Sequence, residues 1–148
     1  MQEVHRHAGR AAWAHILSTA ALDNLSAPER WHPRTGTAVF VAERGDAVVG
    51  FACCGAANET DAPNAGEIRA CYVAPHAWGT GIGQALLAAA VEHLQASGFE
   101  EAIVWTEYRN HRPLRFYRAA GWRLDGVERR YLVHGAEVRE LRHRRALR

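Results

Sequence analysis

The amino-acid sequence predicts an α/β domain built on a mixed sheet with helices packed against it. Strand-like apolar runs alternate with stretches of helical spacing, in the order helix, helix, hairpin, strand, helix, strand, helix, hairpin. The 148 residues contain no internal repeat or low-complexity linker and are enough to bury a substantial core. We therefore expect a single domain over residues 1–148.

The first third of the chain predicts two helices and a hairpin. Apolar side chains at helical spacing indicate a helix from His5 to Asn24, and a capped start indicates a short helix from Ser26 to Trp31. Ala38–Arg44 and Ala47–Cys54 are strand-like runs, and the Gly45-Asp46 pair between them is typical of a hairpin turn.

The remainder predicts further strands, two helices and a closing hairpin. A strand from Glu67 to Val73 is followed by a glycine-rich turn and by a helix from Gly81 to Ser97, which Gly98 ends. The elements expected after it are a strand over Ala102–Thr106, a helix over Asn110–Ala120, and two strands over Val127–Val133 and Ala136–Leu141.

Composition limits the classes of protein to which the chain can belong. Hydrophobic residues make up 48% and charged residues 23%, which is ordinary for a soluble globular protein. No apolar run approaches the roughly 20 residues that a membrane span needs, and the first residues lack the apolar core of a secretion signal. We expect a cytoplasmic location and no membrane partner. The odd number of cysteines favours buried reduced thiols at Cys53, Cys54 and Cys71.

Residue types also exclude or disfavour several chemistries. All 18 basic residues are arginine, so the chain has neither the lysine of a Walker phosphate loop nor a Schiff-base lysine. The histidines form no helix-spaced pair and no Cys-x-x-Cys accompanies them, so we expect no metal site. Alternation within the last strand and a frayed tail account for the C-terminal arginines, and we expect no nucleic-acid partner.

Three glycines at alternate positions, Gly79, Gly81 and Gly83, lie at the start of the helix predicted over Gly81–Ser97. A helix N-terminus has unpaired N–H groups and partial positive charge, and missing side chains let an anion approach the main chain. A phosphate or pyrophosphate is the expected guest, and a tight turn without a ligand is the alternative. The dinucleotide pattern G-x-G-x-x-G fails, because its third glycine would fall on Gln84 or Leu86.

Two longer segments resemble a known family. EIRACYVAP over 67–75, followed by WGTGIGQALL over 78–87, looks like the acetyl-CoA-binding motif of the GNAT superfamily of N-acetyltransferases. NHRPLRFYRAAGW over 110–122 resembles that family's N-x-x-A-x-x-L-Y-x-x-x-G-F segment in register, and a weaker resemblance extends from Trp13 to the C-terminus. The resemblance implies a GNAT-like, mostly antiparallel twisted sheet flanked by helices.

The chain departs from the family pattern at several places. The family's first edge strand normally precedes the first helix and is missing here. Either the sheet lacks this strand, or another chain covers the edge, or the sequence is short. An edge covered by another chain would make a homodimer possible. Trp78 stands where the family often has Gln or Arg, which removes a pyrophosphate-side contact, and Pro113 replaces a small residue. Trp105 stands where the ribosomal-protein acetyltransferases of the superfamily have a catalytic glutamate, so that substrate is not favoured.

The resemblance also implies where acetyl-CoA would lie as cosubstrate. Asn110 would lie near the pantetheine arm and the Tyr117 hydroxyl near the sulfur. The main chain of one strand segment would bond the pantetheine arm through Cys71, Tyr72 and Val73. The pyrophosphate would be cradled by the consecutive amides of Gly79, Thr80, Gly81, Ile82, Gly83 and Gln84.

Acetyl transfer to an amine needs a base and a group that stabilises the departing thiolate. Tyr117 is the candidate acid. A phenol with a pKa near 10 would protonate a thiolate whose thiol has a pKa near 8.5 at a cost of roughly 2 kcal/mol. Tyr117 would therefore act as an acid with a perturbed pKa, donate a hydrogen bond to the thiolate, or only pack by its ring. Glu67 is the candidate base, directly or through water, and Glu107 is a rival. Glu59 and Asp61 would join Glu67 in an acidic rim that attracts a cationic amine.

The sequence therefore predicts an acetyl-CoA-dependent N-acetyltransferase. Its acceptor would be a primary amine of a small molecule or a peptide N-terminus, which attacks the thioester directly. The alternative is a non-catalytic module that binds acetyl-CoA or CoA without turnover.

Overall fold

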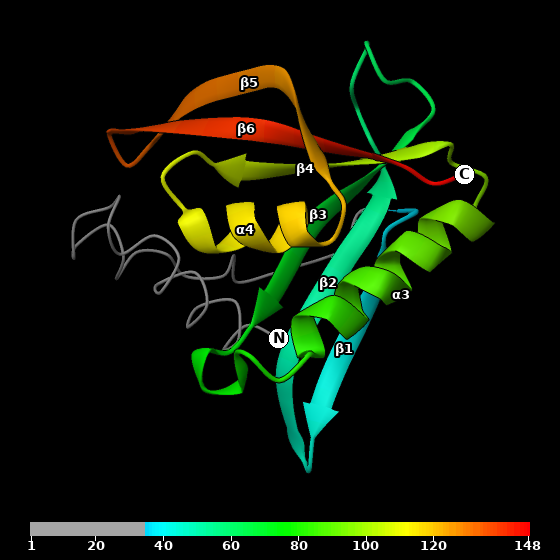
Figure 1. The fold of residues 1–148 in the computed structure, drawn as a ribbon, viewed down its shortest axis with the longest axis vertical. Helices are drawn as coiled ribbons and strands as arrows, with labels where there is room; N and C mark the ends of the chain where they lie inside the picture. Colours follow the sequence, from blue (N-terminus) through cyan, green and yellow to red (C-terminus); the bar gives the residue numbers. More distant parts are fainter. Residues whose placement is uncertain (1–34) are drawn as a thin grey trace.

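The computed structural model describes residues 35–148, which form a six-stranded sheet with two α-helices (Figure 1). The helices predicted over His5–Asn24 and Ser26–Trp31 lie outside the described residues, and so does the predicted absence of a first edge strand. No helix within 35–148 is long and apolar enough to cross a membrane, and no group of His, Cys, Asp and Glu in that range is arranged to hold a metal ion.

The strands run across the sheet in the order β1-β2-β3-β4-β6-β5. β3 and β4 are parallel, whereas every other neighbouring pair is antiparallel. The prediction of a mixed, mostly antiparallel sheet is therefore confirmed. The strands are β1 Ala38–Arg44, β2 Ala47–Ala56, β3 Ala65–Val73, β4 Glu101–Glu107, β5 Arg123–Val133 and β6 Ala136–Ala146.

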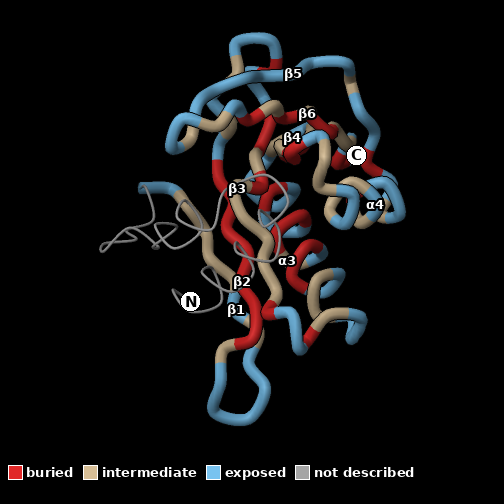
Figure 2. Tube along the Cα trace, turned by 90° about the vertical axis from the view of Figure 1, so that its left-hand side faces the viewer, coloured by how far each residue is buried: buried red, intermediate tan, exposed pale blue. Residues whose placement is uncertain are grey.

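Two helices, α3 (Ile82–Ala96) and α4 (His111–Ala119), pack on the same face of the sheet (Figure 2). Gly66 of β3 permits close packing of α3, because a Cβ at that position would lie 2.5 Å from Leu94 Cδ2. Tyr117 of α4 and Trp122, which follows it, belong to the same apolar core. The buried face of α3 consists of Leu86, Leu87, Ala90, Val91 and Leu94, at the spacing that an amphipathic helix requires.

The C-terminal hairpin is longer than the sequence pattern indicates. β5 begins at Arg123 rather than at Val127, and β6 continues to Ala146 rather than ending at Leu141. The predicted frayed tail is therefore wrong for most of its length. The pairing between β4 and β6 continues as far as Glu101↔Ala146, so hydrogen bonding to β4 keeps β6 in strand conformation up to that residue.

Ion pairs explain how the arginines of β6 are accommodated. Arg142 is fully buried, and its guanidinium donates to Asp61 (2.9 and 2.5 Å) and to Asp125 (2.7 Å). Arg144 makes two hydrogen bonds of 2.5 Å to Glu101. Acidic partners from three other segments offset the charge, and no local pattern in the last strand reveals them.

β3 and β4 separate partway along their length. They are paired only over Ala65–Ile68 and Glu101–Val104, and they diverge beyond that point (Figure 1). The divergence coincides with a bulge in β3, where Arg69 is an extra residue between two pairs of the β2 ladder. Within residues 35–148, the second half of β3 therefore has a neighbouring strand on only one side.

Candidate functional site

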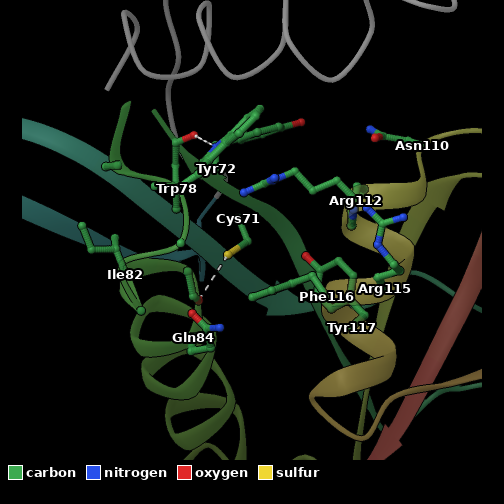
Figure 3. A pocket seen from close by; sticks show the side chains of 16 residues that line it. Cys71, Tyr72, Trp78, Ile82, Gln84, Asn110, Arg112, Arg115, Phe116 and Tyr117 are labelled. Carbon is green, nitrogen blue, oxygen red and sulfur yellow. Dashed lines mark hydrogen bonds between the residues drawn. The ribbon is translucent and has the colours of Figure 1, made fainter. Parts of the chain in front are cut away.

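A pocket of about 650 Å³ lies between the end of β3, the N-terminus of α3 and one face of α4 (Figure 3). Glu67 and Thr80, two of the predicted site residues, do not line it. The predicted site residues that do line it are Cys71, Tyr72, Val73, Gly79, Gly81, Ile82, Gly83, Gln84, Asn110 and Tyr117.

The free edge of β3 forms one wall of the pocket. Ala74 N donates to Val49 O of β2 at 2.8 Å. Because successive residues alternate their main-chain groups between the two sides of a strand, Cys71 and Val73 direct theirs away from β2, where β4 has diverged. Tyr72 lies between them, and its ring packs against Phe51 with centroids 5.7 Å apart. The wall therefore offers main-chain donors and acceptors of the kind that an amide-containing ligand pairs with.

Burial keeps the Cys71 thiol neutral. It raises the pKa of Cys71 to about 12, far above neutral pH, so a thiolate is disfavoured there. Cys71 thus contributes main chain and an apolar surface rather than a nucleophile.

The glycine-rich turn forms the second wall. Gly79 has φ of 71° and Gly81 has φ of 85°, a left-handed conformation that side chains rarely adopt. A Cβ added at Gly79 or Gly81 would meet no atom within 4 Å, so open space lies in front of both residues. Glycine is suited to position 83 for a different reason. A Cβ there would lie 3.3 Å from Phe116 Cε2, so the missing side chain lets α4 approach.

The amides of this turn are available to a ligand. Gly81 is the N-cap of α3, and its carbonyl accepts from Ala85 N at 3.1 Å, with no side chain capping the helix. No hydrogen bond between the described residues uses the N–H groups of residues 79–84. Thr80 turns its hydroxyl back onto the loop, donating to Ala77 O at 2.5 Å. Together with the helix dipole, these amides make an electropositive concavity of main chain.

Tyr117 comes from the side of α4 that faces the pocket. Its ring is 5% exposed and packs against Trp122 (5.7 Å between centroids) and His143 (5.6 Å). Burial raises the pKa of Tyr117 well above its ordinary value of 10.0. The phenol is therefore neutral at physiological pH and suits hydrogen-bond donation better than full proton transfer. Its hydroxyl has no hydrogen-bond partner within residues 35–148, and Figure 3 shows the side chain directed toward the pocket.

Glu67 lies at the point where β3 and β4 diverge. Its neighbours Gly66 and Ile68 pack under α3, so alternation along the strand puts Glu67 on the opposite face of the sheet. Burial raises the pKa of this carboxyl above its ordinary value of 4.5, opposed mainly by Arg129. A carboxylate with a raised pKa is a stronger proton acceptor than an exposed one.

Glu107 is buried and already engaged. Its Oε2 accepts from Arg109 N at 2.6 Å, and its Oε1 accepts from Arg109 Nε at 3.1 Å. Both oxygens of this carboxylate thus already accept hydrogen bonds from Arg109, and an incoming amine would have to compete with them.

The two loop carboxylates of the acidic rim, Glu59 and Asp61, face the guanidinium of Arg142. Asp61 forms the bidentate pair with Arg142, which lowers the pKa of Asp61 to about 2, and Glu59 lies 3.8 Å from the same guanidinium. These two side chains hold Arg142 and the loop before β3 together. Because Asp125 also pairs with Arg142, this guanidinium offsets only part of the negative charge of the cluster.

The pocket residues that the sequence reasoning did not assign to the site include Arg112, Arg115 and Phe116 of α4. Arg112 lies over the Trp78 ring, with its Cζ 3.8 Å from the ring centroid. The signal was available, because spacings of three and four residues put these side chains on one face of a helix with the pocket. Trp78 itself donates from Nε1 to Val73 O at 2.8 Å.

Comparison with known proteins agrees with this arrangement. The acetyltransferase (GNAT) family model matches residues 5–122. A mycothiol acetyltransferase of Thermobispora bispora is 32% identical over 108 residues, which cover 69% of this chain and 36% of that protein. The chain thus spans about a third of the length of this curated relative.

Solved structures share the fold. The ribosomal-protein-alanine N-acetyltransferase of Brucella melitensis superimposes with a TM-score of 0.66 and 28% identity, over 76% of this chain and 70% of that one. The PaiA N-acetyltransferase of Thermoplasma acidophilum, in complex with coenzyme A, has a TM-score of 0.69 and 17% identity, over 93% of this chain and 87% of that one.

Proposed function

Because the chain belongs to the GNAT family of acetyltransferases, we propose that it is an acetyl-CoA-dependent N-acetyltransferase acting on the primary amine of a small molecule or a peptide N-terminus. One observation carries the proposal. A single pocket combines a strand edge whose main-chain groups point away from β2, a turn whose amides have no partner within residues 35–148, and a buried neutral tyrosine. The PaiA N-acetyltransferase with a similar fold binds coenzyme A, which supports the same ligand here.

The pocket has the chemistry that a diphosphate and an amide-bearing arm require. None of the described residues that line it is acidic, and two arginines are among them. The unpaired amides of residues 79–84 favour an anion, since a hydrogen bond to a charged group contributes about 1.5–3 kcal/mol. The main-chain groups of Cys71 and the N–H of Val73, which point away from β2, supply partners for the amides of a pantetheine arm, whereas Val73 O already accepts from Trp78 Nε1.

We derive the transfer step from the same residues. The amine nitrogen attacks the thioester carbon, a C–N bond forms, and the C–S bond breaks. Glu67 takes the proton released by the amine, directly or through water, and Tyr117 donates a hydrogen bond to the departing sulfur. Glu67 and Tyr117 lie on opposite faces of the sheet, so the gap between β3 and β4 would let the amine and the thioester meet.

Calorimetry with CoA and a thiol-release assay with acetyl-CoA and a panel of amines test this function together. We expect CoA to bind and at least one amine to release thiol and gain an acetyl group, read by mass spectrometry. CoA binding without transfer to any amine or peptide would favour the non-catalytic binding module instead. Absence of CoA binding would contradict both functions.

The finer parts of the sequence prediction stay proposals. They are the cytoplasmic location, which cell fractionation would check, and the homodimer, which light scattering would check. The relative named mycothiol acetyltransferase supports a small-molecule acceptor, but this chain spans only about a third of it.

A further inference from the structure

Arg112 and Trp78 form a stacked pair at the pocket. The guanidinium of Arg112 reaches across from α4 and lies 3.8 Å from the centroid of the Trp78 ring (Figure 3). Both residues line the pocket, and Trp78 directly precedes Gly79, the first residue of the amide turn. The pair thus brings a side-chain cation beside the main-chain amides.

Trp78 is itself held in place. Its Nε1 donates to Val73 O at 2.8 Å, which ties the indole to the last residue of β3. A guanidinium stacked on a fixed aromatic face loses less conformational freedom when a ligand binds than one on a free side chain. The ring therefore acts as a platform that orients Arg112.

Within residues 35–148, the donors of Arg112 have no hydrogen-bond or ion-pair partner. Stacking uses the flat face of the guanidinium, whereas its N–H groups point outward in the plane. Within residues 35–148, Arg112 has no acidic partner, and no acidic side chain from that range lines the pocket. A planar, pre-oriented set of charged donors that no described residue engages is suited to the oxygens of a phosphate.

We propose that Arg112, oriented by Trp78, is the cationic half of a two-sided diphosphate site whose other half is the amide turn of residues 79–84. The inference rests on the proposed function. In this site the positive side chain comes from α4, because Trp78, the residue just before the turn, has an uncharged side chain. Trp78 supports the cation and Arg112 contacts the ligand.

Isothermal calorimetry on Arg112→Gln tests the proposal, with Arg118→Gln as the matched control. Arg118 lies on the same helix and is exposed, but it does not line this pocket, so both variants remove one charge from α4. We expect Arg112→Gln to raise the Kd of CoA about tenfold or more, as loss of a charged hydrogen bond does. Arg118→Gln should change that Kd less than twofold, and an equal effect of both variants would overturn the proposal.

Two truncated ligands identify the group that Arg112 binds. The Kd ratio of Arg112→Gln to the unmodified protein should be the same for 3′-dephospho-CoA as for CoA, because both keep the diphosphate. For pantetheine, which has no phosphate, the ratio should fall to one. A penalty that disappears with 3′-dephospho-CoA would assign Arg112 to the 3′-phosphate and overturn the diphosphate assignment.

A double-mutant cycle tests the role of Trp78. Trp78→Phe keeps a ring but loses the bond to Val73 O, and we expect it to weaken CoA binding about threefold in the unmodified background. The loss should be absent in the Arg112→Gln background if Trp78 acts through Arg112. Equal losses in both backgrounds would show that the ring acts independently.

Failure of this proposal is distinguishable from failure of the proposed function. If the unmodified protein binds no CoA, the proposed function fails. If it binds CoA and Arg112→Gln binds it equally well, only the assignment of Arg112 fails. Thermal unfolding of each variant checks that the substitutions leave the fold intact.

Discussion

Tyr117 has the environment of a neutral hydrogen-bond donor. Its ring is buried against Trp122 and His143, and burial raises the pKa of the phenol well above 10.0. The proton therefore stays on Tyr117 while its hydroxyl is available to the pocket. A donor to a developing thiolate stabilises the transition state without being consumed.

Replacing Tyr117 by Phe tests this role. We expect kcat to fall about 10²- to 10⁴-fold, with the Kd of acetyl-CoA nearly unchanged, because the ring packing survives and only the donor is lost. Steady-state kinetics measure it, with Tyr108→Phe as a control that removes a hydroxyl outside the pocket. A loss under threefold would remove the hydroxyl from the mechanism.

The two candidate bases differ in their partners. Burial raises the pKa of Glu67, so the rate should fall as the pH drops through a value above 4.5, where the carboxylate becomes protonated. Glu67→Gln should lower kcat, flatten that limb of the kcat–pH profile and leave acetyl-CoA affinity intact. Glu107→Gln removes an engaged carboxylate and serves as the comparison. If only Glu107→Gln abolishes the acidic limb of the kcat–pH profile, Glu107 and not Glu67 is the base.

At this scale the sequence motif led to most residues of the pocket. The glycines and Tyr117 follow from spacing and resemblance, and the structure brings them to one pocket. The engagement of Glu107 by Arg109 was not predictable, because it depends on the turn after β4. Arg112 was overlooked although its helical spacing from Phe116 indicated a shared face.

The turn and the helix that follows it form the central element of the site. Gly81→Glu should abolish CoA binding, because it places bulk and a like charge in the open space before the amides. The left-handed φ of 85° adds backbone strain, which Gly98→Glu reproduces at φ of 89° outside the pocket. Calorimetry on both variants separates the two causes. Retained CoA affinity in Gly81→Glu would contradict a binding role for the turn.

Elements with a strong local pattern were predicted closely. α3 begins one residue after its predicted start and ends one residue before its predicted end, because Gly81 and Gly98 fix its ends. The divergence of β3 from β4 was not predictable. It depends on a bulge at Arg69, whose side chain pairs outside its own strand with Thr37 Oγ1 and Ala56 O.

At the scale of the molecule, Arg142 connects the loop before β3 to β5 through Asp61 and Asp125. This connection involves residues up to 81 positions apart. The local sequence pattern could not reveal it, and the end of β6 was therefore predicted to be a frayed tail. The connection supports the face of the sheet on which Glu67 lies.

This connection predicts a specific acid sensitivity. The folded pKa of Asp61 is about 2, below its ordinary 3.8, so its carboxylate stabilises the fold above pH 3.8, and the stabilisation is lost as the pH falls through about 2. Urea unfolding across this range should show a smaller loss of unfolding free energy in Asp61→Asn. Asp46→Asn, in the β1–β2 turn, is the control. If the unfolding free energy of both variants depends on pH in the same way, Asp61 does not contribute to stability in acid.

A crystal structure of the protein with CoA would show directly whether the amide turn binds the coenzyme. We expect diphosphate oxygens within hydrogen-bond distance of the main-chain nitrogens of residues 79–84, with the pantetheine arm along Cys71–Val73. A diphosphate bound elsewhere, or a turn that makes no contact with the coenzyme, would contradict this expectation.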